Sequence, residues 1–512
     1  MQRTLFFSFL LAFAILPQCS GTNLLPRTWI GGKWVHSGPG KFSAKGLPGA
    51  VSWMKLTGGA VRVLSTYGAK SNDRRYLTDG MLDRGFEVTA ELRGKGRLRI
   101  EVESKASGSY VPGPFKSKTV VSQWFTATDK WQKILFKGVE NNPWCDAQYV
   151  TFRMASAGEI EVRRPALTYP AFEESKLLLS PVSTFVRCGE KASFNVTYQG
   201  KAPLMLRSYA AASGNKLVQN LPLKEKQFTI EGTGKAGTRR VNVSVPAEKL
   251  SRIAMVTELP KEKYDMLAKK AAAVKLPRKM KILFLGDSLT DYYRGHNYTD
   301  MVRFFLDRSN PGMIITDNRG IGGDNCRYMI KRLTSVEKDE RSFPNSNGRA
   351  RYFNMFNQKY DRIYLFIGAN DSKVHSKDNW QTPYVTLPDQ LTNMRAILKL
   401  LQRKFPGVPI VILGAPNYHW EIARSNAMAR VKRYPGKNIV MFCQEKDVQD
   451  FNSNARKAAA ECNVKFIENF SVTSASKERK AMFEGDGVHL ALPGEVFFAG
   501  VVLDDLAGVF KK

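Results

Sequence analysis

Apolar and polar residues alternate in short runs over the first third of the chain. Examples are VRVLSTY (61–67), GFEVTAEL (85–92), GRLRIEVES (96–104) and YVTFRMA (149–155). A period of two is typical of strands that bury one face, and the Gly, Asn, Asp and Pro residues between the runs indicate turns. Residues 22–169 are therefore predicted to form a β-sandwich of the jelly-roll kind.

A second group of alternating runs covers residues 170–260. It includes ASFNVTY (192–198), RRVNVSVP (239–246) and RIAMVTEL (252–259). Runs of this number and length fit a small immunoglobulin-like β domain. No cluster of catalytic residue types occurs in it, so we expect a spacer or an interaction module.

The pattern changes after residue 260. Residues 261–280 are rich in Lys and Arg and are predicted to be a basic linker, with a helical Ala-rich middle that ends by Pro277. Over residues 281–512, apolar runs alternate with helical patterns, which predicts an α/β domain whose parallel sheet is covered on both faces. The expected strands are 281–286, 313–318, 361–368, 409–415 and 464–468.

The N-terminus has the pattern of a targeting segment. Arg3 precedes an apolar stretch from Leu5 to Leu16, which Pro17 ends. The stretch is too short to span a bilayer, so residues 1–21 are predicted to be a secretory signal peptide. The mature protein is then expected to be secreted or to lie in the periplasm or cell envelope, with lipoprotein processing at Cys19 as the alternative. No later segment looks transmembrane.

The composition is unusually basic. The 512 residues carry 78 Lys and Arg against 46 Asp and Glu, a formal net charge of +32. Such a charge favours an anionic polymer bound through the basic surface, but a soluble protein with a Lys-rich surface fits equally well. No nucleic-acid-binding motif is present, and no cysteine spacing indicates a metal site. Of the six cysteines, Cys443 and Cys462 are either a disulfide pair or free thiols.

One apolar run ends in a residue suited to nucleophilic catalysis. KILFLGDSLTD (281–291) places Ser288 just after a buried strand, at the edge of a parallel sheet where ligands bind. A serine hydroxyl needs a base in contact. Of the five histidines, only His489 has a carboxylate, that of Asp486, three residues before it. Ser288, His489 and Asp486 are therefore predicted to be the nucleophile, the base and the acid that orients the base.

Four short blocks carry a family resemblance. They are GDSLTD (286–291), NRGIGGDN (318–325), IGANDS (367–372) and DGVHL (486–490), and they follow strands or precede the last helix. Together they resemble the SGNH (GDSL-type) hydrolase family, over about the last 230 residues. The resemblance implies a flavodoxin-like α/β fold for residues 281–512 and an esterase that needs neither a metal nor another cofactor.

The resemblance also implies an oxyanion hole. Its donors map to the backbone N–H of Ser288, the backbone N–H of Gly323 and the side chain of Asn370. Gly322 is the nearest alternative to Gly323. Donors of this kind stabilise the negative charge of a tetrahedral intermediate in acyl transfer.

Residues 22–169 loosely resemble carbohydrate-binding jelly-roll modules. The resemblance rests on a turn and strand, TDKWQK, followed by YVTFRM and the closing strand GEIEVRRPALTY. Aromatic side chains of this region either stack on sugar rings or belong to the core. The aromatic residues in question are Trp29, Trp34, Trp53, Tyr110, Trp124 and Trp144.

These features predict an exported serine esterase that removes small acyl groups, acetyl foremost, from polysaccharide. An acylated polysaccharide, or another ester, is the expected partner. The alternatives are a lipid or other carboxylic ester hydrolase, a non-catalytic protein that binds the envelope or a polyanion, and an enzyme that transfers the acyl group to a sugar. An insertion at 416–443 places Tyr418, His419 and Trp420 at the active-site edge, where they either line a subsite or pack as a loop.

Overall fold

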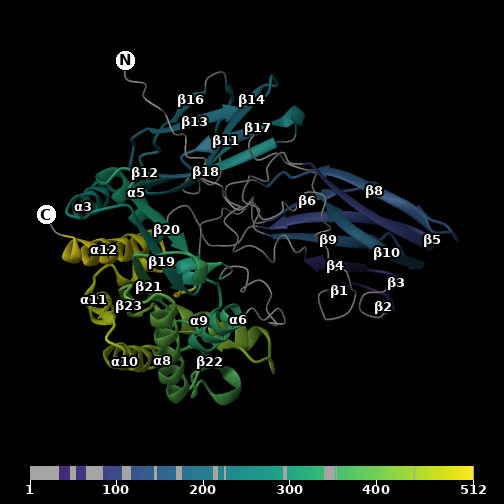
Figure 1. Cartoon of the computed structure of the whole chain (residues 1–512). Coiled ribbons are helices and arrows are strands. Elements are labelled where there is room, and N and C mark those ends of the chain that lie inside the picture. Colours follow the sequence, from purple (N-terminus) through teal and green to yellow (C-terminus); the bar gives the residue numbers. More distant parts are fainter. Residues whose placement is uncertain are drawn as a thin grey trace.

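The computed structural model arranges the chain as two β-rich parts followed by an α/β part (Figure 1). The predicted signal peptide and Cys19 lie outside the residues that the structure describes. Among the residues it does describe, no helix is long and apolar enough to cross a membrane. The described residues are 34–45, 53–64, 85–105, 117–142, 147–168, 176–210, 217–223, 226–248, 250–291, 297–338, 352, 354–442 and 444–510.

The first β part is organised around one long strand, β5 (Gly85–Lys105). Its first half pairs with β8 and β10 and its second half with β6, β7 and β9, all antiparallel. Gly94 and Gly96 have φ of +124° and +131°, and a Cβ on Gly94 would lie 2.1 Å from the carbonyl oxygen of Glu159. The sequence predicted two strands here, because these glycines resemble a turn; the chain instead bends and continues.

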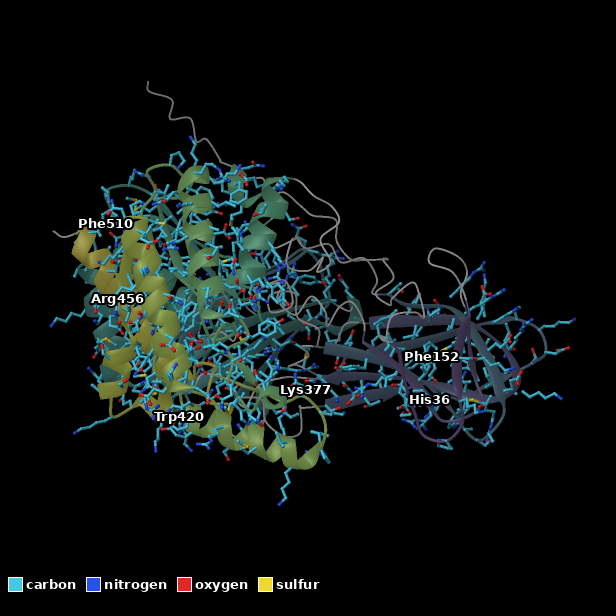
Figure 2. All side chains as sticks on the ribbon, turned by 90° about the horizontal axis from the view of Figure 1, so that it is seen from below. His36, Phe152, Lys377, Trp420, Arg456 and Phe510 are labelled. Carbon is cyan, nitrogen blue, oxygen red and sulfur yellow. The ribbon has the colours of Figure 1, made fainter. Side chains whose placement is uncertain are left out.

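The other strands complete a sheet in the order β1-β4-β9-β5-β10-β3-β2, with β6, β7 and β8 attached to β5. Strands β3 to β10 share one hydrophobic core, in which Phe152, labelled in Figure 2, is fully buried. The strands are β1 (Trp34–Ser37), β2 (Phe42–Lys45), β3 (Trp53–Leu56), β4 (Ala60–Leu64), β6 (Ser117–Val121), β7 (Phe125–Ala127), β8 (Gln132–Val139), β9 (Ala147–Met154) and β10 (Glu159–Thr168).

Six aromatic residues were predicted either to stack on sugars or to lie in the core. Of these six, the structure describes the side chain of Trp124 alone. It is 36% exposed, and the guanidinium groups of Arg97 and Arg99 lie 6.0 and 4.9 Å from its ring. This side chain is therefore at the surface and not in the core. The side chains of the other five aromatics fall outside the described part of the chain.

The second β part consists of two sheets over a common core. One has the order β11-β13-β16 and the other β12-β18-β17-β14-β15, in which β12 and β18 are parallel. The strands are β11 (Leu177–Ser180), β12 (Ser183–Arg187), β13 (Ala192–Tyr198), β14 (Leu204–Ala210), β15 (Leu217–Leu223), β16 (Gln227–Ile230), β17 (Gly237–Val245) and β18 (Leu250–Leu259).

The α/β part contains the predicted parallel sheet, with the strand order β20-β19-β21-β23-β25. All five predicted strands are present within a few residues of their expected bounds. Every residue of β21 and β23 is buried, as expected for strands covered on both faces. The strands are β19 (Met280–Gly286), β20 (Ile314–Asn318), β21 (Arg362–Phe366), β23 (Ile410–Leu413) and β25 (Lys465–Ile467).

Two groups of helices cover this sheet (Figure 1). In one group α3, α5 and α12 pack together, and in the other α8 packs against α6 and α10. The helices of the two groups are α3 (Lys261–Ala272), α5 (Tyr298–Ser309), α6 (Cys326–Glu337), α8 (Leu387–Lys404), α10 (Glu445–Glu461) and α12 (Leu492–Val509). The remaining elements include α4 (Ser288–Asp291), α9 (Trp420–Arg433), α11 (Phe470–Ala475), β22 (Val374–His375) and β24 (Val440–Met441).

The segment expected as a linker differs from the prediction. Its Ala-rich middle is helical, as α3, and the helix ends before Pro277. Tyr264, Leu267 and Ala271 are buried in the same core as the parallel sheet. An apolar residue at every third or fourth position outweighs the Lys-rich composition, because none of the lysines of the helix is buried. This segment is therefore packed against the α/β part and is not a free connection.

The second β part also contacts the α/β core. Phe185 of β12 is 1% exposed, and its ring centroid lies 5.2 Å from that of Phe304 and 6.3 Å from that of Phe305, both on α5. Tyr264 of α3 packs edge-on against Phe305 at 5.0 Å. One aromatic cluster thus joins β12, α3 and α5.

The described cysteines are free thiols. They are Cys188, Cys326 and Cys462, so the alternative of a bond between Cys443 and Cys462 is not realised. Cys443 itself lies outside the described residues.

Candidate active site

Ser288 lies at the carboxyl end of β19, where the chain turns into α4. The turn is fixed by its neighbours. A Cβ on Gly286 would come within 2.3 Å of the carbonyl oxygen of Phe366 and of the Thr290 hydroxyl, so only glycine fits. Asp287 caps the turn by accepting the N–H of Leu289 at 3.0 Å. Because of this local packing, Ser288 stands at the sheet edge with a defined orientation.

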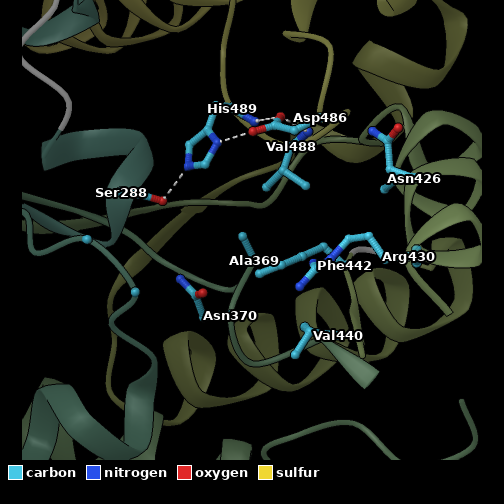
Figure 3. Close-up of a pocket in the computed structure, with 14 residues that line it drawn as sticks. Ser288, Ala369, Asn370, Asn426, Arg430, Val440, Phe442, Asp486, Val488 and His489 are labelled. Atoms are coloured by element: carbon cyan, nitrogen blue, oxygen red, sulfur yellow. Dashed lines mark hydrogen bonds and ion pairs between the residues drawn. The ribbon is translucent and has the colours of Figure 1, made fainter. Parts of the chain in front are cut away.

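His489 and Asp486 complete a line of hydrogen bonds to Ser288 (Figure 3). The Ser288 Oγ lies 3.0 Å from Nε2 of His489, and Nδ1 of His489 lies 2.5 Å from Oδ2 of Asp486. The other carboxylate oxygen of Asp486 accepts the backbone N–H groups of Val488 and His489 at 2.9 and 3.0 Å. The geometry matches that of a nucleophile, its general base and an orienting carboxylate.

The charge of this carboxylate is favoured by its surroundings. Burial raises the pKa of Asp486, but the hydrogen bond and charge of His489 and the two backbone N–H groups outweigh it and hold the pKa well below its usual range. Asp486 is therefore ionised at neutral pH, and it can stabilise an imidazolium on His489.

The loop that carries His489 is held from both sides. Gly487 has a φ of +78°, and a Cβ on it would lie 2.3 Å from the carbonyl oxygen of His419. The backbone N–H of His419 donates to the carbonyl of Gly487 at 3.1 Å, and that of Glu484 donates to the carbonyl of His489 at 2.8 Å. A glycine is therefore required at 487, as the sequence suggested.

The three predicted oxyanion donors, Ser288, Gly323 and Asn370, line one cavity of about 330 Å³ together with His489. The backbone N–H of Gly322 donates to Oδ2 of Asp291 at 2.8 Å, so it does not point to an oxyanion in the cavity. Among the described residues, no acceptor is found for the N–H of Ser288 or of Gly323. This arrangement favours Gly323 over Gly322 as the backbone donor, and Gly323, with a φ of +78°, adopts a conformation suited to glycine.

The side chain of the third predicted donor, Asn370, is positioned by a contact with Asp287. Its Nδ2 lies 3.5 Å from Oδ2 of Asp287. Burial raises the pKa of Asp287 to about 8, and the charges of Asp371 and Asp324 add to the effect. At neutral pH Asp287 is thus mainly a neutral carboxylic acid beneath the oxyanion donors. It adds little negative charge where an oxyanion would form.

Asp324 and Asp371 complete a buried layer under the cavity. Burial raises the pKa of Asp324 to about 7 and that of Asp371 to about 6. Arg332 donates to Asp324, and the backbone N–H of Cys326 donates to Asp371 at 3.0 Å. These carboxyl groups hold the second and third sequence blocks together.

One wall of the cavity comes from the insertion at 416–443, and of the two alternatives for Tyr418, His419 and Trp420 the structure favours packing over a subsite. Tyr418 is 1% exposed and packs on Phe483 at 5.5 Å, and His419 is 8% exposed and supports the catalytic loop. Trp420 begins α9 and does not line the cavity. These three residues are therefore packing residues and do not form a substrate subsite.

The lining residues come instead from α9 and the segment after it. They recur at helical spacing, which is a signal present in the sequence but unrelated to any catalytic motif. From α9 the cavity is lined by Ala423, Asn426, Ala427 and Arg430, and from the segment around β24 by Val440 and Phe442.

Comparison with known proteins agrees with this geometry. Residues 284–495 match the model of the GDSL-like lipase/acylhydrolase family. This part of the chain is a GDSL-type hydrolase domain. The resemblance found in the four sequence blocks is thereby confirmed, and the GDSL domain is an esterase- or lipase-like hydrolase that acts on carboxylic esters.

Solved structures resemble the GDSL domain at low identity. A lipase/acylhydrolase from Enterococcus faecalis is 16% identical, with a TM-score of 0.31 over 45% of this chain and 97% of its own. The esterase EstA from Pseudoalteromonas sp., solved with monoethylphosphonate, is 14% identical, with a TM-score of 0.27 over 45% and 95%.

The remaining comparisons are weak or empty. A CBM22-1 xylan-binding domain from Paenibacillus barcinonensis Xyn10C is 13% identical, with a TM-score of 0.21 over 29% of this chain and 93% of its own. A likeness of this size carries no information on ligands. No curated protein matches the chain.

Proposed function

We propose that the chain is an exported serine esterase that removes small acyl groups, acetyl foremost, from polysaccharide. The observation that carries the catalytic part is the contact of 3.0 Å between the Ser288 Oγ and Nε2 of His489, in a cavity that also holds Asn370 and Gly323. The proposal narrows the ester hydrolysis that the GDSL domain implies to one mechanism and one class of substrate.

The proposed reaction has two halves. Ser288 attacks the ester carbonyl while His489 takes the hydroxyl proton and Asp486 stabilises the resulting imidazolium. The oxyanion receives hydrogen bonds from the N–H groups of Ser288 and Gly323 and from the amide of Asn370. His489 then gives its proton to the leaving alcohol. Water, activated by the same histidine, releases the acid from the acyl-enzyme.

The size of the cavity supports a small substrate. Its volume of about 330 Å³ is at the low end of the range of roughly 300 to 1,000 Å³ that is usual for ligand sites. A short acyl group together with one sugar unit fits this space better than a long acyl chain does. Export follows from the predicted signal peptide, and the two β parts would hold the polymer near the cavity.

Lipid or other ester hydrolysis is the second candidate. The observation that favours it is the apolar part of the cavity, which includes Val440, Phe442 and Val488. Rates on p-nitrophenyl acetate and p-nitrophenyl octanoate separate the two candidates. A higher kcat/KM for the acetate supports the first, and a higher kcat/KM for the octanoate supports the second.

The proposed mechanism is tested with Ser288→Ala, assayed beside the unaltered protein on p-nitrophenyl acetate and on acetylated xylan. We expect kcat to fall by a factor on the order of 10⁴ to 10⁶, as for other hydrolases that lose their nucleophile. Ser453→Ala, an exposed serine on α10, is the matched control. Equal rates for Ser288→Ala and the unaltered protein would refute the serine mechanism.

The same assay addresses the remaining alternatives. An unaltered protein that hydrolyses neither ester, yet binds an anionic polymer, would support a binding protein. Acyl transfer would appear as an acylated sugar when a free sugar is added to the reaction, because an alcohol then intercepts the acyl-enzyme in place of water.

A further inference from the structure

One face of α9 is turned toward the catalytic cavity. Ala423, Asn426, Ala427 and Arg430 recur at intervals of three and four residues, so they lie along one side of the helix. The two alanines leave space, and Arg430 supplies a positive charge. In Figure 3 its side chain extends from α9 past Phe442 into the cavity, across from Ser288.

Arg430 has no acidic partner among the described residues. The only acidic residue of α9 is Glu421, which pairs with Arg479 at 2.5 Å. Among the described residues that line the cavity, Asp486 is the only acidic one, and it is engaged by His489. The cavity therefore presents a guanidinium group whose charge is not balanced by the described residues.

The helix that carries Arg430 is fixed to the catalytic loop. Asn426 Nδ2 donates to the carbonyl of Gly485 at 2.9 Å. Arg479 donates to the carbonyl of Tyr418 at 2.7 Å, just before the helix. Ala427 is also buried in a cluster with Val374, Ile439 and Met441. The helix backbone at Arg430 is thus fixed relative to Ser288 before any substrate binds, and the side chain of Arg430 is exposed on that helix.

From this arrangement we propose that the alcohol part of the substrate carries a carboxylate that binds Arg430, so that the enzyme prefers acyl esters of acidic sugars, such as uronates, over those of neutral sugars. The inference rests on the proposed esterase function and narrows its substrate. A guanidinium matches a planar carboxylate through two parallel hydrogen bonds. A single guanidinium beside a neutral amide suits a group with one negative charge better than a dianion.

The inference is tested with a pair of substrates that differ in one group. Methyl 3-O-acetylglucuronoside carries a carboxylate where methyl 3-O-acetylglucoside carries a hydroxymethyl group. The measured quantity is the ratio of kcat/KM for the acidic substrate to kcat/KM for the neutral one. For Arg430→Gln we expect this ratio to fall about tenfold, since a charged hydrogen bond from an exposed guanidinium is lost.

Arg424→Gln is the matched control, because Arg424 lies on the same helix, is exposed and does not line the cavity. We expect it to leave the ratio unchanged, and Arg430→Lys to restore part of the ratio by returning the charge without the planar fork. A ratio near one for the unaltered protein, or a ratio that falls equally in both Gln variants, would overturn the inference. If the unaltered protein hydrolyses neither sugar ester nor p-nitrophenyl acetate, the proposed function fails as well.

Discussion

The two sides of the catalytic cavity are built in different ways. On one side, Ser288, Asp486 and His489 stand on tight turns whose glycines and backbone hydrogen bonds allow few substitutions. On the other side, α9 presents alanines, an asparagine and an arginine from one face of a regular helix. The first side sets the reaction, because a shift of a hydrogen-bonding atom there alters the transition state. The second side, formed by α9, selects the substrate.

The largest effect is expected from Asp486→Asn, on the side that sets the reaction. The change keeps the shape but removes the charge that orients His489 and stabilises its protonated form. We expect kcat on p-nitrophenyl acetate to fall by a factor on the order of 10⁴. Asp450→Asn, which removes a surface carboxylate paired with Lys446, is the control. A loss smaller than tenfold would show that His489 does not depend on Asp486.

A smaller effect is expected from Asn370→Ala. Removal of one oxyanion donor typically lowers kcat by about 10² to 10³, with little change in KM, because the hydrogen bond forms mainly in the transition state. The measurement is a full kinetic curve on p-nitrophenyl acetate, beside the exposed control Asn438→Ala. A rise in KM without a fall in kcat would instead mark Asn370 as a ground-state contact.

Ala423→Val changes the α9 side of the cavity, which selects the substrate. Ala423 lines the cavity and is 6% exposed, so two added methyl carbons take space from the substrate. We expect kcat/KM on acetylated xylan to fall about tenfold more than kcat/KM on p-nitrophenyl acetate. Met428→Val on the outer face of α9 is the control, since Met428 is 40% exposed. An equal loss on both substrates would mean that α9 also positions the reacting groups.

The smallest expected effect concerns stability and pH. Asp287 has a pKa of about 8 in the folded protein against 3.8 as its ordinary value, so between these pH values the folded state binds the extra proton. The free energy of unfolding then falls as pH rises, by up to about 1.4 kcal/mol per pH unit for one such group. Asp324 and Asp371 act in the same direction at lower pH.

Asp287→Asn separates the contribution of Asp287 to the pH dependence of stability from the contributions of the other carboxyl groups. The amide stays neutral in both states, so the urea midpoint of the variant should depend less on pH between 5 and 8 than that of the unaltered protein. An identical pH dependence in both proteins would show that Asp287 is ionised beneath the oxyanion donors.

The sequence predicted the reaction side of the cavity because each of its features is local. Gly286 and Gly487 are needed where a Cβ would come within 2.3 Å of a carbonyl oxygen, and each stands within two residues of a catalytic side chain in a short block. Strand order and crossovers then bring the blocks to one edge of the sheet. Of Gly322 and Gly323, only the structure distinguishes the donor, because the partner of Gly322 is Asp291, 31 residues earlier.

Other features depend on contacts between distant segments, which a single sequence does not display. The face of α9 that lines the cavity has no motif, and the aromatic residues before it proved to be packing residues. Likewise, α3 resembled a solvated basic linker until its apolar face was placed against α5 and α12. The break expected in β5 at Gly94 and Gly96 is a bend, which only the partner strands β8, β9 and β10 define.

The central claim is that Ser288 is the nucleophile and that His489 activates it. The most direct test is labelling with a fluorophosphonate, followed by mass spectrometry of the digested protein. The account predicts one adduct, on the peptide that contains Ser288, formed slowly in His489→Ala and absent in Ser288→Ala. An adduct on another residue, or ester hydrolysis that continues after Ser288 is fully labelled, would contradict the claim.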